Sequence, residues 1–181
     1  MKEKIEFTRI DSPLVERAAE VVEFALRQKL TIVTAESCTG GLLAAVLSEA
    51  PGAGTQLHGG FVTYTKDQKA VALGVARDVL ERESAVSEPV ARAMAEGELA
   101  HSKADISVAI TGVAGPSPDE DGNPVGLVHF AAARQGFSTL HEERRFGDIG
   151  RGPVRYQAVL AALSLLERCA KQDKGRIRAA E

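Results

Sequence analysis

Within residues 34–41, Ser37, Cys38 and Thr39 place two hydroxyls and a thiol, followed by two glycines, where a strand is expected to turn into a helix. Residues 30–33 form a short β-rich apolar run, and residues 42–47 have the composition of a buried helix. The first N–H groups of a helix lack internal partners, and the helix dipole favours negative charge there. Ser37 could therefore act as a nucleophile, or the turn could hold a phosphate. The alternative is a simple N-cap by Ser37 or Thr39, but the two glycines favour close approach of a ligand or another backbone.

A serine nucleophile requires a base, and residues 64–69 offer the best candidates because they follow a strand that should end at the same sheet edge. Lys66 or Lys69 can act as a base only where burial or a nearby cation lowers its pKa toward neutrality. On its own, such a residue is more often a solvated helix lysine. Cys38 is a second candidate nucleophile, since a helix N-terminus lowers a thiol pKa, but it ranks below Ser37. No recognisable triad signature contains any of the four histidines, His58, His101, His129 and His141.

A second glycine-rich turn, residues 111–116, follows the clearest buried strand, residues 106–111. In open α/β sheets, ligands bind where strands end at their carboxyl edge. If the two strands are close neighbours, their turns form opposite walls of one cleft. Backbone N–H groups from both walls could then hold an oxyanion or a phosphate.

Two further charged features, an acidic segment and an arginine pair, are less specific. The acidic residues 119–121 hint at calcium, but the ligand and glycine spacing of an EF-hand is missing, so we interpret them as part of a solvated turn. Arg151 and Arg155, near the start of the last helix, could pair with a phosphate.

Helical and strand-like patterns alternate along the chain. Ser12-Pro13 is a strong helix start, and Ser87 is expected to cap another helix. This order predicts an α/β fold: a three-layer α/β/α sandwich with a mixed, mostly parallel central sheet. We expect a single domain over residues 1–181, with a core at about 12–171 and frayed ends. The expected helices are 12–29, 40–50, 67–73, one from 87 and 153–171, and the expected strands are 30–36, 59–65, 106–111 and a hairpin of 126–133 with 137–146.

Composition excludes several classes of protein. The net charge is −3, so no global basic field recruits nucleic acid. The two cysteines, Cys38 and Cys169, have no metal-type spacing and suit a reducing compartment. The first residues lack the apolar core of a signal peptide, and no segment is long enough to span a bilayer. We therefore expect a cytoplasmic protein that binds neither membrane nor nucleic acid and holds no metal.

Taken together, several segments resemble the CinA C-terminal domain family, whose characterised enzymes are nicotinamide-nucleotide amidases. The segments are residues 34–42, 60–65, 73–75, 85–88, 104–105, 110–116 and 124–126. The resemblance implies hydrolysis of the carboxamide of nicotinamide mononucleotide to nicotinate mononucleotide and ammonia, without a metal or organic cofactor. It also makes a homo-oligomer plausible.

The resemblance assigns roles to individual residues. Ser37 matches the family nucleophile, Lys69 the lysine that activates it, and Tyr64 and Thr111 polar residues near the reacting centre. An acyl-enzyme on Ser37 would be resolved by water, with backbone N–H groups stabilising the oxyanion. The two glycine turns and an arginine pair would bind the substrate and its ribose phosphate, through Cys38, Thr39, Gly40, Gly41, Gly112, Ala114, Gly115, Arg151 and Arg155.

The chain departs from the family pattern near the expected nucleotide site. Lys66 replaces an asparagine, residues 117–121 replace a glycine run, and Asn123 replaces a lysine. A Gly-Asp-Arg motif here contains two extra residues, Ile149 and Gly150. These changes remove or move positive charge and add negative charge. Two alternatives therefore stand beside the leading hypothesis: a hydrolase of another small amide, and a non-catalytic nucleotide-binding module.

Overall fold

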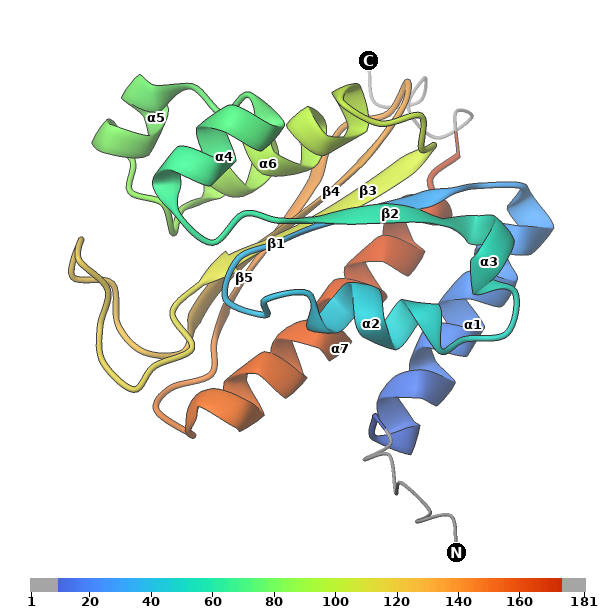
Figure 1. The fold of residues 1–181 in the computed structure, drawn as a ribbon, viewed down its shortest axis with the longest axis horizontal. Coiled ribbons are helices and arrows are strands. Elements are labelled where there is room, and N and C mark those ends of the chain that lie inside the picture. Colours follow the sequence, from blue (N-terminus) through green and yellow to red (C-terminus); the bar gives the residue numbers. More distant parts are fainter. Residues whose placement is uncertain (1–9, 174–181) are drawn as a thin grey trace, which may run out of the picture.

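A computed structural model describes residues 10–173, and the outermost ends that were expected to fray lie outside the described residues. A five-stranded sheet with the order β2-β1-β3-β4-β5 forms its centre (Figure 1). β1 pairs in parallel with β2 and β3, whereas β4 runs antiparallel to both β3 and β5. Four strands therefore share one direction, which confirms the mixed sheet. The strands are β1 (Ile32–Glu36), β2 (Leu57–Val62), β3 (Ile106–Gly112), β4 (Leu127–Arg134) and β5 (Leu140–Arg145).

Helices cover both faces of the sheet, which confirms the three-layer sandwich. In Figure 1, α4, α5 and α6 lie above the sheet, and α1, α2, α3 and α7 lie below it. Within residues 10–173, no helix is both long and apolar enough to cross a bilayer. The helices are α1 (Ser12–Gln28), α2 (Leu42–Ser48), α3 (Ala53–Gln56), α4 (Lys66–Leu73), α5 (Arg77–Arg82), α6 (Glu88–Ala100) and α7 (Arg151–Ala170).

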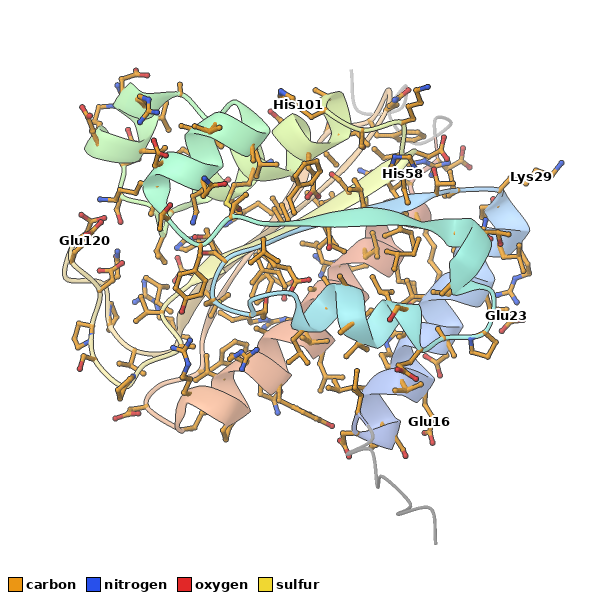
Figure 2. The ribbon with its side chains drawn as sticks, in the orientation of Figure 1. Glu16, Glu23, Lys29, His58, His101 and Glu120 are labelled. Carbon is orange, nitrogen blue, oxygen red and sulfur yellow. The ribbon has the colours of Figure 1, made fainter. Side chains whose placement is uncertain are left out.

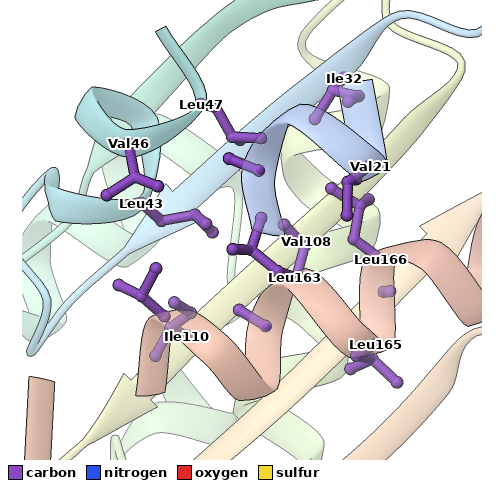
Figure 3. Packing of buried hydrophobic residues seen from close by; sticks show 14 of the residues in the cluster. Val21, Ile32, Leu43, Val46, Leu47, Val108, Ile110, Leu163, Leu165 and Leu166 are labelled. Atoms are coloured by element: carbon purple, nitrogen blue, oxygen red, sulfur yellow. The ribbon is translucent and has the colours of Figure 1, made fainter. Parts of the chain in front are cut away.

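Side chains point alternately to the two faces of the sheet, so the hydrophobic core consists of two clusters, one on each face. Val108 and Ile110 of β3 pack with Leu163 of α7 in the larger cluster (Figure 3). Ala109, between them in sequence, faces the smaller cluster with α6. Because successive strand residues point to opposite faces, large branched side chains fill one side while alanines let α6 approach the other.

The close crossing of α4 and α6 depends on Gly97. A Cβ added there would lie 2.0 Å from the carbonyl oxygen of Leu73, so only glycine allows this approach. The crossing holds α4 against α6, and α4 carries Lys69.

Several element boundaries differ from the sequence-based expectation. β2 ends at Val62, so residues 63–65 form a connection rather than strand. α2 begins only at Leu42, because Gly40 and Gly41 adopt positive φ angles of 60° and 93°. Ser87 occupies the N-cap of α6, but its hydroxyl donates to Ser84 O instead of capping the helix. The short helices α3 and α5 carry too few residues for a periodic signal and were not predicted.

Candidate active site

The two glycine-rich turns and the start of α4 surround one cavity of about 380 Å³. β1 and β3 are adjacent parallel strands, so their carboxyl ends meet at the same sheet edge. The cavity is lined by Ser37, Cys38, Tyr64, Thr65, Lys66, Lys69, Ala85, Val86, Thr111, Gly112, Val113, Ala114, Gly115, Ser117, Asp119, Glu120, Asp121 and Arg151.

Ser37 and Lys69 contact each other at the floor of this cavity. Lys69 Nζ lies 2.9 Å from Ser37 Oγ and donates to Thr63 O at 2.9 Å. The side chains are nearly enclosed, since Lys69 is 1% exposed and Ser37 is 7% exposed. The two groups are therefore close enough for direct proton transfer.

Burial changes the acid–base properties of both Lys69 and Cys38. Desolvation lowers the pKa of Lys69 from 10.5 to about 8, so part of the amine is neutral near pH 7. Desolvation raises the pKa of Cys38 to about 12. The Cys38 thiol therefore stays protonated, contrary to the activation that a helix N-terminus would give.

The N-terminus of α2 is already occupied by an anion from the chain itself. The carboxylate of Glu36 accepts hydrogen bonds from the backbone N–H groups of Gly41, Leu43 and Ala44, at 3.0, 3.0 and 2.8 Å. The expectation that these groups are free to hold a phosphate is thus wrong. Sequence reasoning overlooked Glu36, although negative charge is favoured at a helix N-terminus.

Tyr64 and Arg151 form one wall of the cavity. Arg151 donates from Nη2 to Tyr64 Oη and from Nη1 to Gly115 O, both at 2.8 Å. Tyr64 itself is 55% exposed, so its ring stands at the mouth rather than on the floor. Thr111 is buried, and its hydroxyl donates to Ala85 O at 2.7 Å.

Four residues expected to touch substrate do not line this cavity: Thr39, Gly40, Gly41 and Arg155. Arg155 Nη2 donates to Thr39 O at 2.7 Å, so its guanidinium supports the loop that follows Ser37. Gly40 and Gly41 supply the left-handed backbone of that loop. These residues therefore affect the cavity only through the conformation of the loop that follows Ser37.

Two of the departures from the family pattern contact each other at the cavity rim. Lys66 Nζ lies 2.9 Å from Asp121 Oδ1 and 3.1 Å from Glu120 Oε1. Ser84 donates to the other oxygen of Asp121 at 2.7 Å. The acidic segment is an exposed turn, as expected, and its ion pairs with Lys66 tie it to α4. The added negative charge is partly offset by Lys66.

None of the four histidines lines the cavity. In Figure 2, Glu120 lies at the left edge of the molecule, whereas His101 lies near the top and His58 to the right of centre. His129 and His141 stack on each other, with their ring centroids 5.4 Å apart. Among residues 10–173, no group of three or more His, Cys, Asp or Glu side chains is arranged to hold a metal ion.

Comparison with known proteins places this chain in a family. The model of the CinA C-terminal domain matches residues 15–170. The chain belongs to this family. The Agrobacterium tumefaciens structure described as competence/damage inducible protein CihA superposes with a TM-score of 0.86 at 40% identity, covering 92% of this chain and 100% of that one.

Curated CinA relatives differ in length. A putative competence-damage inducible protein of Symbiobacterium thermophilum is 44% identical over 146 residues, which are 77% of this chain but only 34% of that protein. The chain therefore spans about a third of the length of this relative. The Escherichia coli K12 protein named nicotinamide-nucleotide amidohydrolase PncC is 40% identical over 157 residues, covering 86% of this chain and 94% of that one.

Proposed function

We propose that this chain hydrolyses the carboxamide of nicotinamide mononucleotide, with Ser37 as nucleophile and Lys69 as base. The observation that carries the proposal is the 2.9 Å contact between Lys69 Nζ and Ser37 Oγ inside a cavity. The lowered pKa of Lys69 supports its role, because a base needs a neutral amine. The match to a protein named nicotinamide-nucleotide amidohydrolase, which covers 86% of this chain and 94% of that one, supports the substrate.

The reaction proceeds through an acyl-enzyme. Neutral Lys69 takes the proton of Ser37 as Oγ attacks the amide carbon, and the resulting ammonium returns that proton to the leaving nitrogen. Ammonia departs, and the acyl group remains on Ser37. Lys69 then removes a proton from water as the water oxygen attacks the ester, and it returns that proton to Ser37 Oγ as the Oγ–C bond breaks and the carboxylic acid leaves. The net change is amide plus water to acid plus ammonia.

Both glycine-rich turns provide backbone N–H groups that can stabilise the oxyanion of the transition state. Cys38 and Ala114, one from each turn, line the cavity, and their backbone N–H groups are our candidates for the oxyanion site. Removing one such donor in other enzymes lowers kcat by about 100- to 1,000-fold.

The ribose phosphate binds at Arg151. This is the arginine among the cavity-lining residues, and Tyr64 and Gly115 hold its guanidinium in place. A planar guanidinium suits a phosphate because it can donate two parallel hydrogen bonds. Arg155 acts indirectly, by supporting the loop after Ser37 through Thr39.

The direct test is ammonia release from nicotinamide mononucleotide by the purified protein. Ser37→Ala should reduce the rate by at least about 1,000-fold, because a nucleophile and its base act as a unit. Lys69→Met should cause a loss of similar size. Ser164→Ala is the control, since that hydroxyl lies exposed on α7 and bonds only to Leu160 O among the contacts seen. Wild-type protein that releases no ammonia at high concentration would refute the proposal.

The charged rim supports a second candidate, an amidase for a different small amide. Glu120 and Asp121 add negative charge beside the cavity, and this disfavours a substrate whose phosphate lies near them. Comparing nicotinamide, its riboside and the mononucleotide as substrates separates the two. Preference for the mononucleotide favours the first proposal, and preference for the riboside favours the second.

A further inference from the structure

Glu36 is a buried carboxylate beside the nucleophile that the reaction itself does not use. It is the last residue of β1, is fully buried and directly precedes Ser37. Its backbone pairs with Val62 of β2 and Ile110 of β3. The side chain is thus fixed at the centre of the sheet edge that carries the cavity.

The carboxylate holds the far end of the loop that contains Ser37. Oε2 accepts from the N–H groups of Gly41 and Leu43, and Oε1 accepts from Ala44. Hydrogen bonds to an ionised acceptor are about twice as strong as neutral ones. The positive end of the α2 dipole adds to this attraction.

The same loop is fixed at its near end and across its middle. Ser37 N donates to Ile110 O at 3.0 Å, and Gly40 N donates to Ser37 O at 3.0 Å. The left-handed conformation of Gly41 belongs to the turn that brings its own N–H onto Glu36. Residues 37–41 therefore have one arrangement in which all these bonds are made.

Glu36 is also linked to the base through its main chain. Its carbonyl accepts from Thr63 N at 2.8 Å, and Thr63 O in turn accepts from Lys69 Nζ at 2.9 Å. One residue thus connects the loop that presents the hydroxyl with the segment that holds the amine.

We propose that Glu36 is a positioning residue, whose carboxylate holds residues 37–41 so that Ser37 Oγ faces Lys69 Nζ. Its carboxylate accepts the N–H groups of Gly41, Leu43 and Ala44 at the start of α2. The role of Glu36 in turnover rests on the proposed function, whereas its effect on the reactivity of Ser37 does not.

Glu36→Gln tests the carboxylate with little change in size. The amide supplies one acceptor oxygen, and its NH₂ group must face a backbone N–H that also donates. A buried donor left unpaired is unfavourable, so the loop shifts. A misplacement of about 1 Å can lower a rate by about 100-fold. We expect kcat to fall by about 10- to 100-fold while KM changes by less than about threefold.

Glu98→Gln is the matched control, because Glu98 is another fully buried glutamate and lies on α6 outside the cavity lining. It should leave kcat and KM unchanged. Glu36→Asp keeps the charge one methylene shorter and should give a kcat between those of wild type and Glu36→Gln. If Glu36→Gln does not fold, the kcat of Glu36→Asp is compared with that of wild type instead, and a lower value is expected.

Labelling of Ser37 by phenylmethylsulfonyl fluoride gives a readout that needs no substrate. The Ser37 oxygen bonds to sulfur, fluoride leaves, and the hydroxyl proton passes to Lys69. Glu36→Gln should slow this labelling by about the same factor as kcat, with Glu98→Gln labelled at the wild-type rate. Folded Glu36→Gln that is labelled as fast as wild type overturns the proposal. Normal labelling of wild type without ammonia release would instead refute the proposed function alone.

Discussion

If Lys69 is the base, activity must follow the fraction of its amine that is neutral. With a pKa of about 8, that fraction is about one tenth at pH 7 and about nine tenths at pH 9. The value of kcat/KM should therefore rise about tenfold between these two pH values and level off above them. The sign follows from burial, which disfavours the ammonium and releases its proton at lower pH.

The assay is the initial rate of ammonia release at low substrate concentration from about pH 6 to about pH 10, because kcat/KM reports the free enzyme. Thermal unfolding at each pH identifies any loss of rate that is due to loss of folded protein. A midpoint near about 6.5 would point to a histidine, and one near about 10.4 to a solvated lysine. Either midpoint, or a flat profile, would refute the reasoning.

Protein stability reports the same pKa without any catalysis. The unfolded chain keeps the Lys69 proton up to about its ordinary pKa of 10.5, whereas the folded chain releases it at about 8. Below pH 8 this burial costs about 3 kcal/mol of stability, and the cost disappears as the pH rises from about 8 to 10.5. Wild type should gain stability relative to Lys69→Met over that range. Parallel curves for the two proteins would contradict the lowered pKa.

Three further outcomes follow. Iodoacetamide at about pH 8 should not inactivate the enzyme, since Cys38 is buried and burial raises its pKa to about 12. Inactivation that tracks alkylation of Cys38 in a mass spectrum would contradict this. Glu98→Gln should become more stable than wild type in urea as the pH rises from about 4.5 to 7, because desolvation raises the Glu98 pKa and the unfolded chain loses the proton first. Equal stability at both pH values would be inconsistent with that shift. Gly97→Ala should lose about 1–3 kcal/mol, because its Cβ meets Leu73 O, whereas Gly54→Ala, with open space around it, should not. Urea unfolding measures both, and an unaffected Gly97→Ala would show that α4 and α6 can separate freely.

The architecture was predictable because periodic patterns are local. Helices alternating with short apolar strands fixed the layers, and two hydroxyl-plus-glycine turns after parallel strands placed the cavity. The proximity of Ser37 and Lys69 followed from the same topology, since both come after strands that end at one edge. The short helices α3 and α5 offered no comparable signal.

Contacts between distant residues explain what the sequence could not reveal. Lys66 meets Asp121 across 55 positions, and nothing local indicates that pairing. Arg155 donates a hydrogen bond to Thr39 O, 116 positions away, and does not line the cavity. The role of Glu36 could have been predicted from its position before a helix. Its carboxylate accepts the N–H groups at the helix N-terminus where the sequence pattern suggested a bound phosphate.

The central claim is tested most directly by a crystal structure of Ser37→Ala with nicotinamide mononucleotide bound. We predict the carboxamide carbon within about 3.5 Å of the position that Ser37 Oγ would occupy, which is the spacing of a near-attack geometry. Lys69 Nζ should lie on the same side, and the phosphate should contact Arg151. A nucleotide bound with its carboxamide directed away from residue 37 and Lys69 would contradict the account.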